Sequence, residues 1–159
     1  MRDRAEHWVE TPVLLEGWSD LVGILTRPAG EANGLGVALF GQGERAPTVG
    51  AGRVFVTMAR RLAARGSTVL RLDYPGVGYS GGATGHYALA RPMTDVGRSA
   101  IDTLERVGAA RAVGVGSCYG GRVALALAAE DPRVVGVAAL PLSLRDDDLG
   151  EPMLMPASV

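Results

Sequence analysis

The segment Gly116–Gly121 limits what this chain can fold into more than any other, because it joins an apolar run to a helical pattern through a very tight turn. The run Ala112–Gly116 is short and continuously apolar, which is typical of a strand buried on both faces. Tyr119–Glu130 follows as a predicted helix that ends at Asp131 and Pro132. The helix residues available for the core are Val123, Leu125, Ala126 and Leu127.

Strand and helix patterns alternate along the rest of the chain. Two apolar runs, His7–Leu15 and Asp20–Thr26, flank a turn and predict a hairpin. Further strands are expected over Leu35–Phe40, over Ser67–Asp73 with Thr68–Leu72 as its centre, and over Val134–Leu140. Helices are expected over Arg53–Arg65, ended by Gly66, and from a cap at Thr94 or Asp95 to about Arg106. The first of these has a predicted apolar side of Val54, Met58, Leu62 and Ala63.

This order predicts an α/β fold, with a mostly parallel sheet, helices on both faces and an N-terminal hairpin. A chain of 159 residues suits one domain. We expect residues 1–148 to form the core, with six strands, and residues 149–159 to form a C-terminal tail. Ligands of such sheets bind at the carboxyl ends of the strands. The long loop 74–92 lies at that edge, which favours a functional role for it.

Composition excludes several classes of function. Sixteen basic and seventeen acidic residues give a net charge of −1, which argues against a nucleic-acid binder or a polybasic membrane surface. The sequence contains no lysine, so a Schiff-base lysine is excluded. One cysteine allows neither an internal disulfide nor a multi-cysteine metal site, and we expect no metal and no organic cofactor. The polar N-terminus has no signal-peptide pattern, so a cytoplasmic location is expected.

The residues G-x-Cys-x-G-G around Cys118 match a nucleophile elbow, in which the reactive residue sits on a sharp strand-to-helix turn. Gly116 and Gly120 supply the tiny residues that such a turn requires. The turn would place a helix N-terminus beside Cys118 and favour developing negative charge there. The backbone N–H of Tyr119 is one expected oxyanion donor, and Gln42 or Gly43, after the Leu35–Phe40 strand, would supply the second.

Three alternatives compete with this interpretation. A lone cysteine is commonly a small buried hydrophobe. Ser117 is another candidate for the reactive residue, but Gly116 and Gly120 bracket Cys118 symmetrically and not Ser117. A glycine-rich strand-to-helix turn can also cradle a phosphate, although the sequence has neither G-x-G-x-x-G nor a Walker lysine.

The chain resembles the α/β-hydrolase superfamily, with a cysteine elbow similar to that of dienelactone hydrolases. The stretches Arg53–Gly66 and Leu70–Gly82 resemble the exosortase-associated hydrolase branch in particular. The resemblance extends from about Val13 to Leu144. It implies a hydrolase that acts through a nucleophile, an acid and a late histidine. It also implies that Asp73 and the following glycines shape the loop beside the active site.

The sequence departs from this pattern near its end, where the last two strands and the histidine loop are missing. Only His7 and His86 exist. His86, on the loop at the carboxyl edge, is the candidate base for Cys118, although a loop histidine is commonly just solvated. Asp146, with Asp147 and Asp148, is the candidate acid or else a solvated turn. The resemblance therefore implies an incomplete α/β-hydrolase fold.

Two classes of function remain open. The first is a hydrolase or acyltransferase, including a thioesterase, that acts on an ester, thioester or lactone through Cys118. Elimination is a further possible reaction. The second is a catalytically incomplete module that binds a partner chain or ligand. If Val134–Leu140 is the outermost strand, its bare edge needs a cover. The tail, a second copy of the chain or a separate polypeptide would provide one.

Overall fold

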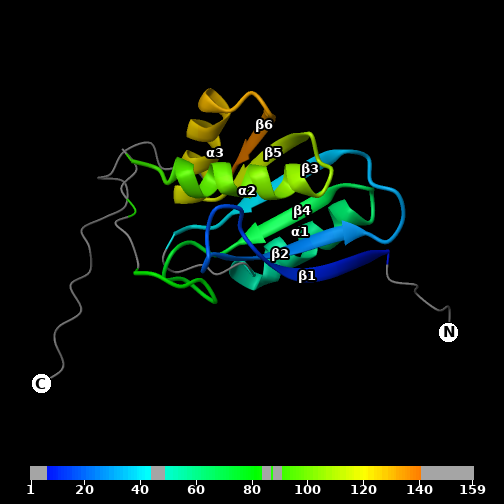
Figure 1. Cartoon of the computed structure of the whole chain (residues 1–159), viewed down its shortest axis with the longest axis horizontal. Helices are drawn as coiled ribbons and strands as arrows, with labels where there is room; N and C mark the ends of the chain where they lie inside the picture. The colour runs from blue at the N-terminus through cyan, green and yellow to red at the C-terminus, as the bar shows by residue number, and fades with distance from the viewer. Residues whose placement is uncertain (1–6, 44–48, 84–86, 88–90, 141–159) are drawn as a thin grey trace, which may run out of the picture.

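A computed structural model describes residues 7–43, 49–83, 87 and 91–140. It contains six strands, which are β1 (Trp8–Leu14), β2 (Val22–Pro28), β3 (Leu35–Phe40), β4 (Thr68–Leu72), β5 (Arg111–Gly116) and β6 (Val134–Ala139). Three α-helices and a short 3₁₀ turn connect them, namely η1 (Ala51–Arg53), α1 (Val54–Ala63), α2 (Thr94–Arg106) and α3 (Tyr119–Glu130). Figure 1 shows this order along the chain.

All six strands form one sheet in the order β1-β2-β4-β3-β5-β6. The hairpin β1–β2 is antiparallel, and β2 also runs antiparallel to β4. Strands β4, β3, β5 and β6 are mutually parallel, so their carboxyl ends meet at one edge of the sheet. The predicted fold class is confirmed, and β6 is the outermost of the described strands at one side.

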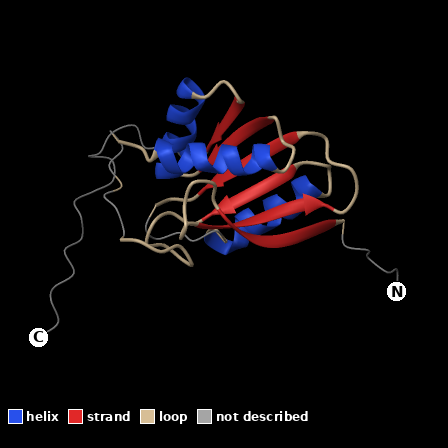
Figure 2. Cartoon of the chain, in the orientation of Figure 1, coloured by secondary structure: helices blue, strands red, loops and turns tan. Residues whose placement is uncertain are grey.

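The helices cover both faces of the sheet, as Figures 1 and 2 show. Helix α1 lies on one face, where Phe55 and Ala59 pack against Val37, Leu39 and Val69. Helices α2 and α3 lie side by side on the other face over the larger core. The buried side chains that these two helices contribute are Val96, Ala100, Ile101, Leu104, Tyr119, Val123, Ala124 and Leu127.

Two predicted helix faces were wrong in part. Val54 is 48% exposed, and α1 buries Phe55, Val56 and Ala59 instead, because three consecutive apolar residues offer two overlapping stripes and the larger ring takes the core. Leu125 is 42% exposed. Helix α3 is rotated away from it because Ala124 lies against Gly114 of β5, where any added Cβ would meet the alanine Cβ at 3.0 Å.

The predicted cap of α2 was also wrong. The N-cap residue is Met93, and neither Thr94 nor Asp95 caps the helix through its side chain. The amide of Met93 donates a hydrogen bond to the phenol oxygen of Tyr119 at 2.9 Å. A contact from a distant helix therefore fixes where α2 begins, and local side-chain capping does not.

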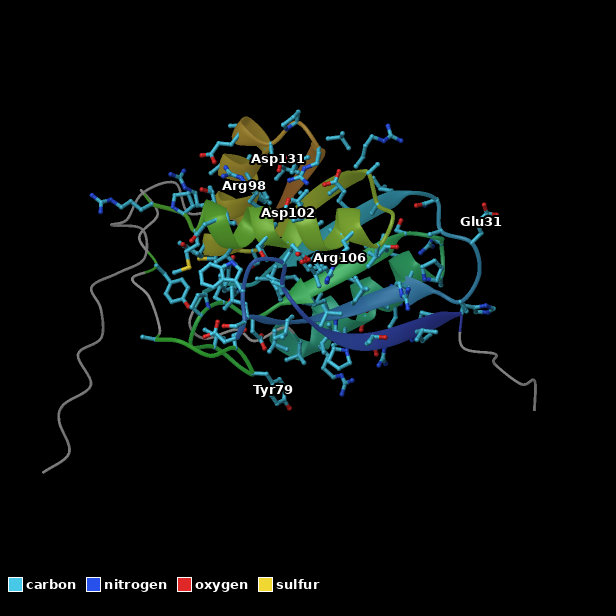
Figure 3. All side chains as sticks on the ribbon, in the orientation of Figure 1. Glu31, Tyr79, Arg98, Asp102, Arg106 and Asp131 are labelled. Carbon is cyan, nitrogen blue, oxygen red and sulfur yellow. The ribbon has the colours of Figure 1, made fainter. Side chains whose placement is uncertain are left out.

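An ion network ties α2 to the segment between α3 and β6. The Arg133 guanidinium contacts Asp131 and Asp102 at 2.7 Å each, and Glu105 at 2.5 Å. Asp102 and Asp131 are labelled in Figure 3. The hydrogen bond from Arg133 lowers the pKa of Asp131, although burial opposes that shift.

Among the described helices, none is both long and apolar enough to cross a bilayer.

A second ion network joins the hairpin to the parallel strands. Arg71 of β4, whose side chain is only 5% exposed, contacts Glu10 of β1 at 2.7 Å, and Arg60 of α1 contacts the same carboxylate at 2.6 Å. Burial by itself would raise the pKa of Glu10. The Arg60 hydrogen bond and the two arginine charges outweigh that effect and hold the pKa below its ordinary value.

The substitution Glu10→Gln is expected to lower the free energy of unfolding by about 2–4 kcal/mol, because it removes the negative charge that faces the buried Arg71 guanidinium. Urea unfolding at neutral pH measures the change. The matched control is Glu130→Gln, which removes an exposed pair with Arg98 and should cost less than about 0.5 kcal/mol. Equal losses of unfolding free energy in the two variants would contradict a stabilising role of the Glu10–Arg71 ion pair.

The same carboxylate predicts a pH dependence. Its pKa is lower in the folded chain than in the unfolded chain, so its contribution is complete above the ordinary carboxyl pKa of 4.5. The contribution is lost as the pH falls from there through the lowered pKa of folded Glu10. The stability difference between the natural chain and Glu10→Gln should therefore shrink over that acidic window.

Candidate functional site

Cys118 occupies a sharp turn between the end of β5 and the first turn of α3. Its backbone angles are φ 52° and ψ −118°, a region that non-glycine residues rarely adopt. Two short-range hydrogen bonds close the turn, from the Gly120 amide to the Ser117 carbonyl and from the Gly121 amide to the Cys118 carbonyl, each 3.0 Å long. The Cys118 side chain is half-buried, so it is not an ordinary core residue.

Gly116 and Gly120 are required by close backbone contacts. A Cβ on Gly120 would overlap the carbonyl oxygens of Phe40 and Gly41, and a Cβ on Gly116 would overlap the backbone of Gly120. The Ser117 amide also donates to the Phe40 carbonyl at 3.2 Å. The turn and the loop after β3 are therefore in direct main-chain contact. The residue with positive φ is Cys118 and not Ser117, as the glycine spacing predicts.

The two expected oxyanion donors lie on these adjoining segments. Tyr119 is the first residue of α3, so its N–H has no partner within the helix. Gln42 follows Phe40 by two residues, on the loop that contacts the turn, and its side chain is exposed. Its carboxamide nitrogen donates a hydrogen bond to the Ser117 hydroxyl at 3.1 Å. The two segments are thus joined through side chains as well as through main chain.

Three tyrosine rings form a cluster beneath this turn. Tyr74, Tyr87 and Tyr119 make edge-to-face pairs with ring centroids 5.0–5.8 Å apart. The Tyr87 ring also lies against Gly43, where a Cβ would meet it at 3.0 Å. Burial raises the pKa of both Tyr74 and Tyr119, so both remain neutral phenols at neutral pH. Among the described residues, the fully buried Tyr74 hydroxyl has no hydrogen-bond partner.

The loop after β4 is held by Asp73 and Ser80, as its predicted structural role requires. The buried Asp73 carboxylate accepts a hydrogen bond from the Tyr79 amide at 3.1 Å, and Gly78 at φ 59° closes directly over it. The Ser80 hydroxyl donates to the Asp73 carbonyl at 2.8 Å and accepts from the Val22 amide at 2.9 Å. Tyr79 points away from the molecule and is 84% exposed (Figure 3).

The structure places Cys118 and Tyr119 on the turn between Gly116 and Gly120, and it places Gln42 on the adjoining loop, where its side chain bonds to Ser117. His86 and Asp146 lie outside the described residues, so their predicted roles stay predictions. His7 directly precedes β1, whose first residue pairs with the last residue of β2. Because β2 runs antiparallel to β4, His7 lies at the opposite end of the sheet from Cys118. In the part of the chain that is described, no group of three potential metal ligands occurs.

An open pocket of about 360 Å³ is found at that opposite end, lined by residues that include Arg27, Thr68 and Val107. It does not include Cys118.

Sequence reasoning missed two features that do surround the turn, namely the tyrosine cluster and the bond between the Gln42 and Ser117 side chains. One signal was present for the first, because all four tyrosines fall just beyond the carboxyl ends of predicted strands or in the loop that follows.

The close contact at Gly120 predicts that Gly120→Ala will not fold stably, or will lose more than about 3 kcal/mol, because the new methyl group would displace two backbone carbonyls. The control is Gly136→Ala in β6, where an added Cβ meets only a valine methyl at 3.6 Å. That variant should stay within about 0.5 kcal/mol of the natural chain. Similar unfolding curves for both variants would refute the contact.

Backbone strain at Cys118 predicts an unusual order of stabilities. Cys118→Gly should be more stable than Cys118→Ala by about 1 kcal/mol, because glycine adopts a positive φ without steric cost. The neighbouring pair Ser117→Gly and Ser117→Ala should show the usual order, with the alanine variant more stable, since the φ of Ser117 is not positive. Thermal unfolding of the four variants measures both differences.

Comparisons with known proteins agree with this architecture. A model described as the alpha/beta hydrolase family matches residues 34–158. An esterase from Pyrococcus furiosus aligns with a TM-score of 0.65 and 18% identity, over 82% of this chain and 50% of its own. DcsB, solved in complex with its substrate analogue, aligns with a TM-score of 0.71 and 14% identity, over 86% and 46%. A cold-adapted esterase from an Arctic intertidal metagenomic library gives 0.59 and 21%, over 86% and 62%.

At these identities the structural likeness establishes the fold alone. The chain spans about half the length of the first two proteins. Among curated proteins there is no significant match. The family model, however, covers most of the chain, including the loop after β3 and the turn at Cys118. The chain therefore belongs to the alpha/beta hydrolase family.

Proposed function

We propose that this chain carries out acyl chemistry on an ester, thioester or lactone, with Cys118 as the nucleophile. The observation that carries the proposal is the backbone of Cys118, at φ 52° and ψ −118° between β5 and α3. A non-glycine residue in such a conformation costs about 1–3 kcal/mol, and strain of this kind is typical of functional sites. The turn corresponds to a nucleophile elbow, and partial exposure leaves the sulfur within reach of a substrate.

The proposed step forms one bond and breaks one. The Cys118 sulfur attacks the carbonyl carbon, and the tetrahedral intermediate collapses with cleavage of the bond to the leaving oxygen or sulfur. The thiol proton ends on the leaving alcohol or thiol, and an acyl-cysteine remains. Water or a second nucleophile then releases the acyl group. His86 is the proposed proton carrier and Asp146 its acid partner, as the sequence resemblance implies.

The surroundings of Cys118 suit a developing oxyanion. The Tyr119 N–H begins α3, where the helix dipole favours negative charge. The Gln42 N–H, on the loop in contact with the turn, is the proposed second donor. Burial raises the pKa of Tyr74 and Tyr119 above the already basic value of an ordinary phenol, so both are uncharged. They therefore contribute no charge that would repel the oxyanion.

The similar proteins support the reaction class only broadly. Two of them are named esterases, which fits hydrolysis of an ester by this chain. Because this chain spans only about half of the Pyrococcus protein, complete turnover is a further part of the proposal and acylation of Cys118 is its minimal form. A thioester is the substrate most easily attacked by a cysteine, since nucleophile and leaving group are alike.

The proposal predicts that Cys118 will be acylated by a small thioester, such as a phenyl thioacetate, faster than a free cysteine derivative at the same pH. Intact-mass spectrometry measures the adduct, and the single cysteine of the chain makes the assignment unambiguous. Iodoacetamide should likewise react faster with Cys118 than with the free derivative. Cys118→Ala is the control and should gain no adduct. Reaction at or below the rate of the free thiol, with both reagents, would contradict the nucleophile.

A second candidate function is a binding module without catalysis. The observation that favours it is strand β6, which is outermost among the described strands on its side of the sheet, with Val135 54% exposed and Leu140, just after it, 59% exposed. An apolar sheet edge of this kind is commonly covered by another polypeptide segment. Size-exclusion chromatography with intact mass would then reveal a stable complex, together with a Cys118 thiol no more reactive than the free derivative.

A further inference from the structure

The Gln42 carboxamide is a polar side-chain group that bonds directly to the residue preceding Cys118. Its nitrogen donates to the Ser117 hydroxyl at 3.1 Å. The Ser117 amide is in turn fixed by the Phe40 carbonyl at 3.2 Å. Gly43, the residue after Gln42, lies under the Tyr87 ring. The bond to Ser117 therefore orients the exposed carboxamide, and the loop that carries it packs against the turn and against the Tyr87 ring.

This arrangement leaves some hydrogen-bonding groups of the Gln42 carboxamide available to a ligand. A glutamine side chain carries two N–H donors and one acceptor oxygen. Only one of these donors is used, in the bond to Ser117, and no other hydrogen bond of the Gln42 side chain occurs among the described residues. Within the described part of the chain, one donor and the acceptor oxygen thus have no protein partner, on an exposed side chain bonded to the residue before the proposed nucleophile. A planar donor–acceptor pair is complementary to another amide group.

We propose that the Gln42 carboxamide, oriented by Ser117, recognises an amide of the substrate close to the reacting carbonyl. This inference rests on the proposed function of Cys118. The preferred acyl donors are then uncharged thioesters or esters that carry a secondary amide, either in the leaving group or in the acyl group. Charge is not required of the substrate, because Gln42, Ser117 and Tyr119 are all neutral. Gln42 is a specificity residue through its side chain and a proposed oxyanion donor through its backbone.

Two pairs of thioesters test the inference. The first pair places the amide in the leaving group, as S-acetyl-N-acetylcysteamine against S-pentyl thioacetate. The second pair places it in the acyl group, as the S-ethyl thioester of N-acetylglycine against that of pentanoic acid. The rate of Cys118 acylation is followed by intact mass and divided by the rate for a free cysteine derivative, which removes differences in intrinsic reactivity. In at least one pair the natural chain should favour the amide by about 3- to 10-fold, the range for one or two neutral hydrogen bonds.

Gln42→Met keeps the length and the backbone amide but removes the carboxamide, so the preference should fall to about one. Ser117→Ala releases the carboxamide and should give an intermediate preference. Asn33→Ala is the matched control, since it removes a carboxamide that bonds to Ser67 at the other edge of the sheet and should leave the preference unchanged.

Three results would overturn the inference. Equal normalised rates for both members of both pairs in the natural chain would exclude amide recognition while leaving the nucleophile intact. A Gln42→Met variant that slows amide and amide-free donors by the same factor would assign the side chain to loop positioning alone. Failure of every thioester to acylate Cys118 would remove the proposed function and this inference with it.

Discussion

The approach of Gly120 to the carbonyl oxygens of Phe40 and Gly41 is the contact on which the rest of the site depends. It is a contact between two backbones, so neither segment can move without the other. The carboxyl end of β3 is thereby locked to the start of α3, and the residue between β5 and α3 must take a positive φ to make the connection. Strain at Cys118 is the local consequence of a packing requirement that two glycines make possible.

Side chains then complete what the backbone contact begins. The Gln42–Ser117 hydrogen bond joins the same two segments on the solvent side. On the inner side, the Tyr87 ring covers Gly43, and the Tyr119 phenol oxygen accepts a hydrogen bond from the Met93 amide at the start of α2. Four connections that are distant in sequence therefore converge on one turn. Such convergence is what a preorganised site needs, because donors held by several independent contacts do not have to reorganise when charge develops.

The strands and helices were largely predictable because their apolar patterns are local. Helix α3 begins and ends at the predicted residues, and the hairpin and the buried strands lie where their patterns put them. The errors concern which face of a helix is buried and which residue caps it. Leu125 turned outward because Ala124 has to fit against Gly114, and α2 is capped by Met93 because Tyr119 lies nearby. Both depend on residues of other elements, which no local pattern contains.

For the candidate site, the sequence by itself determined which residue stands in the turn, because glycine spacing is set by steric contacts that only a hydrogen atom in place of Cβ can satisfy. It also showed that these 159 residues supply no lysine and no second cysteine. Only the tertiary structure decided that Gln42 bonds to Ser117, that three phenols lie beneath the turn, and that His7 is at the wrong end of the sheet. These facts follow from strand order and loop packing, which bring together residues far apart in sequence, such as Gln42 and Ser117, 75 positions apart. The sum of such long-range contacts is a property of the folded chain alone.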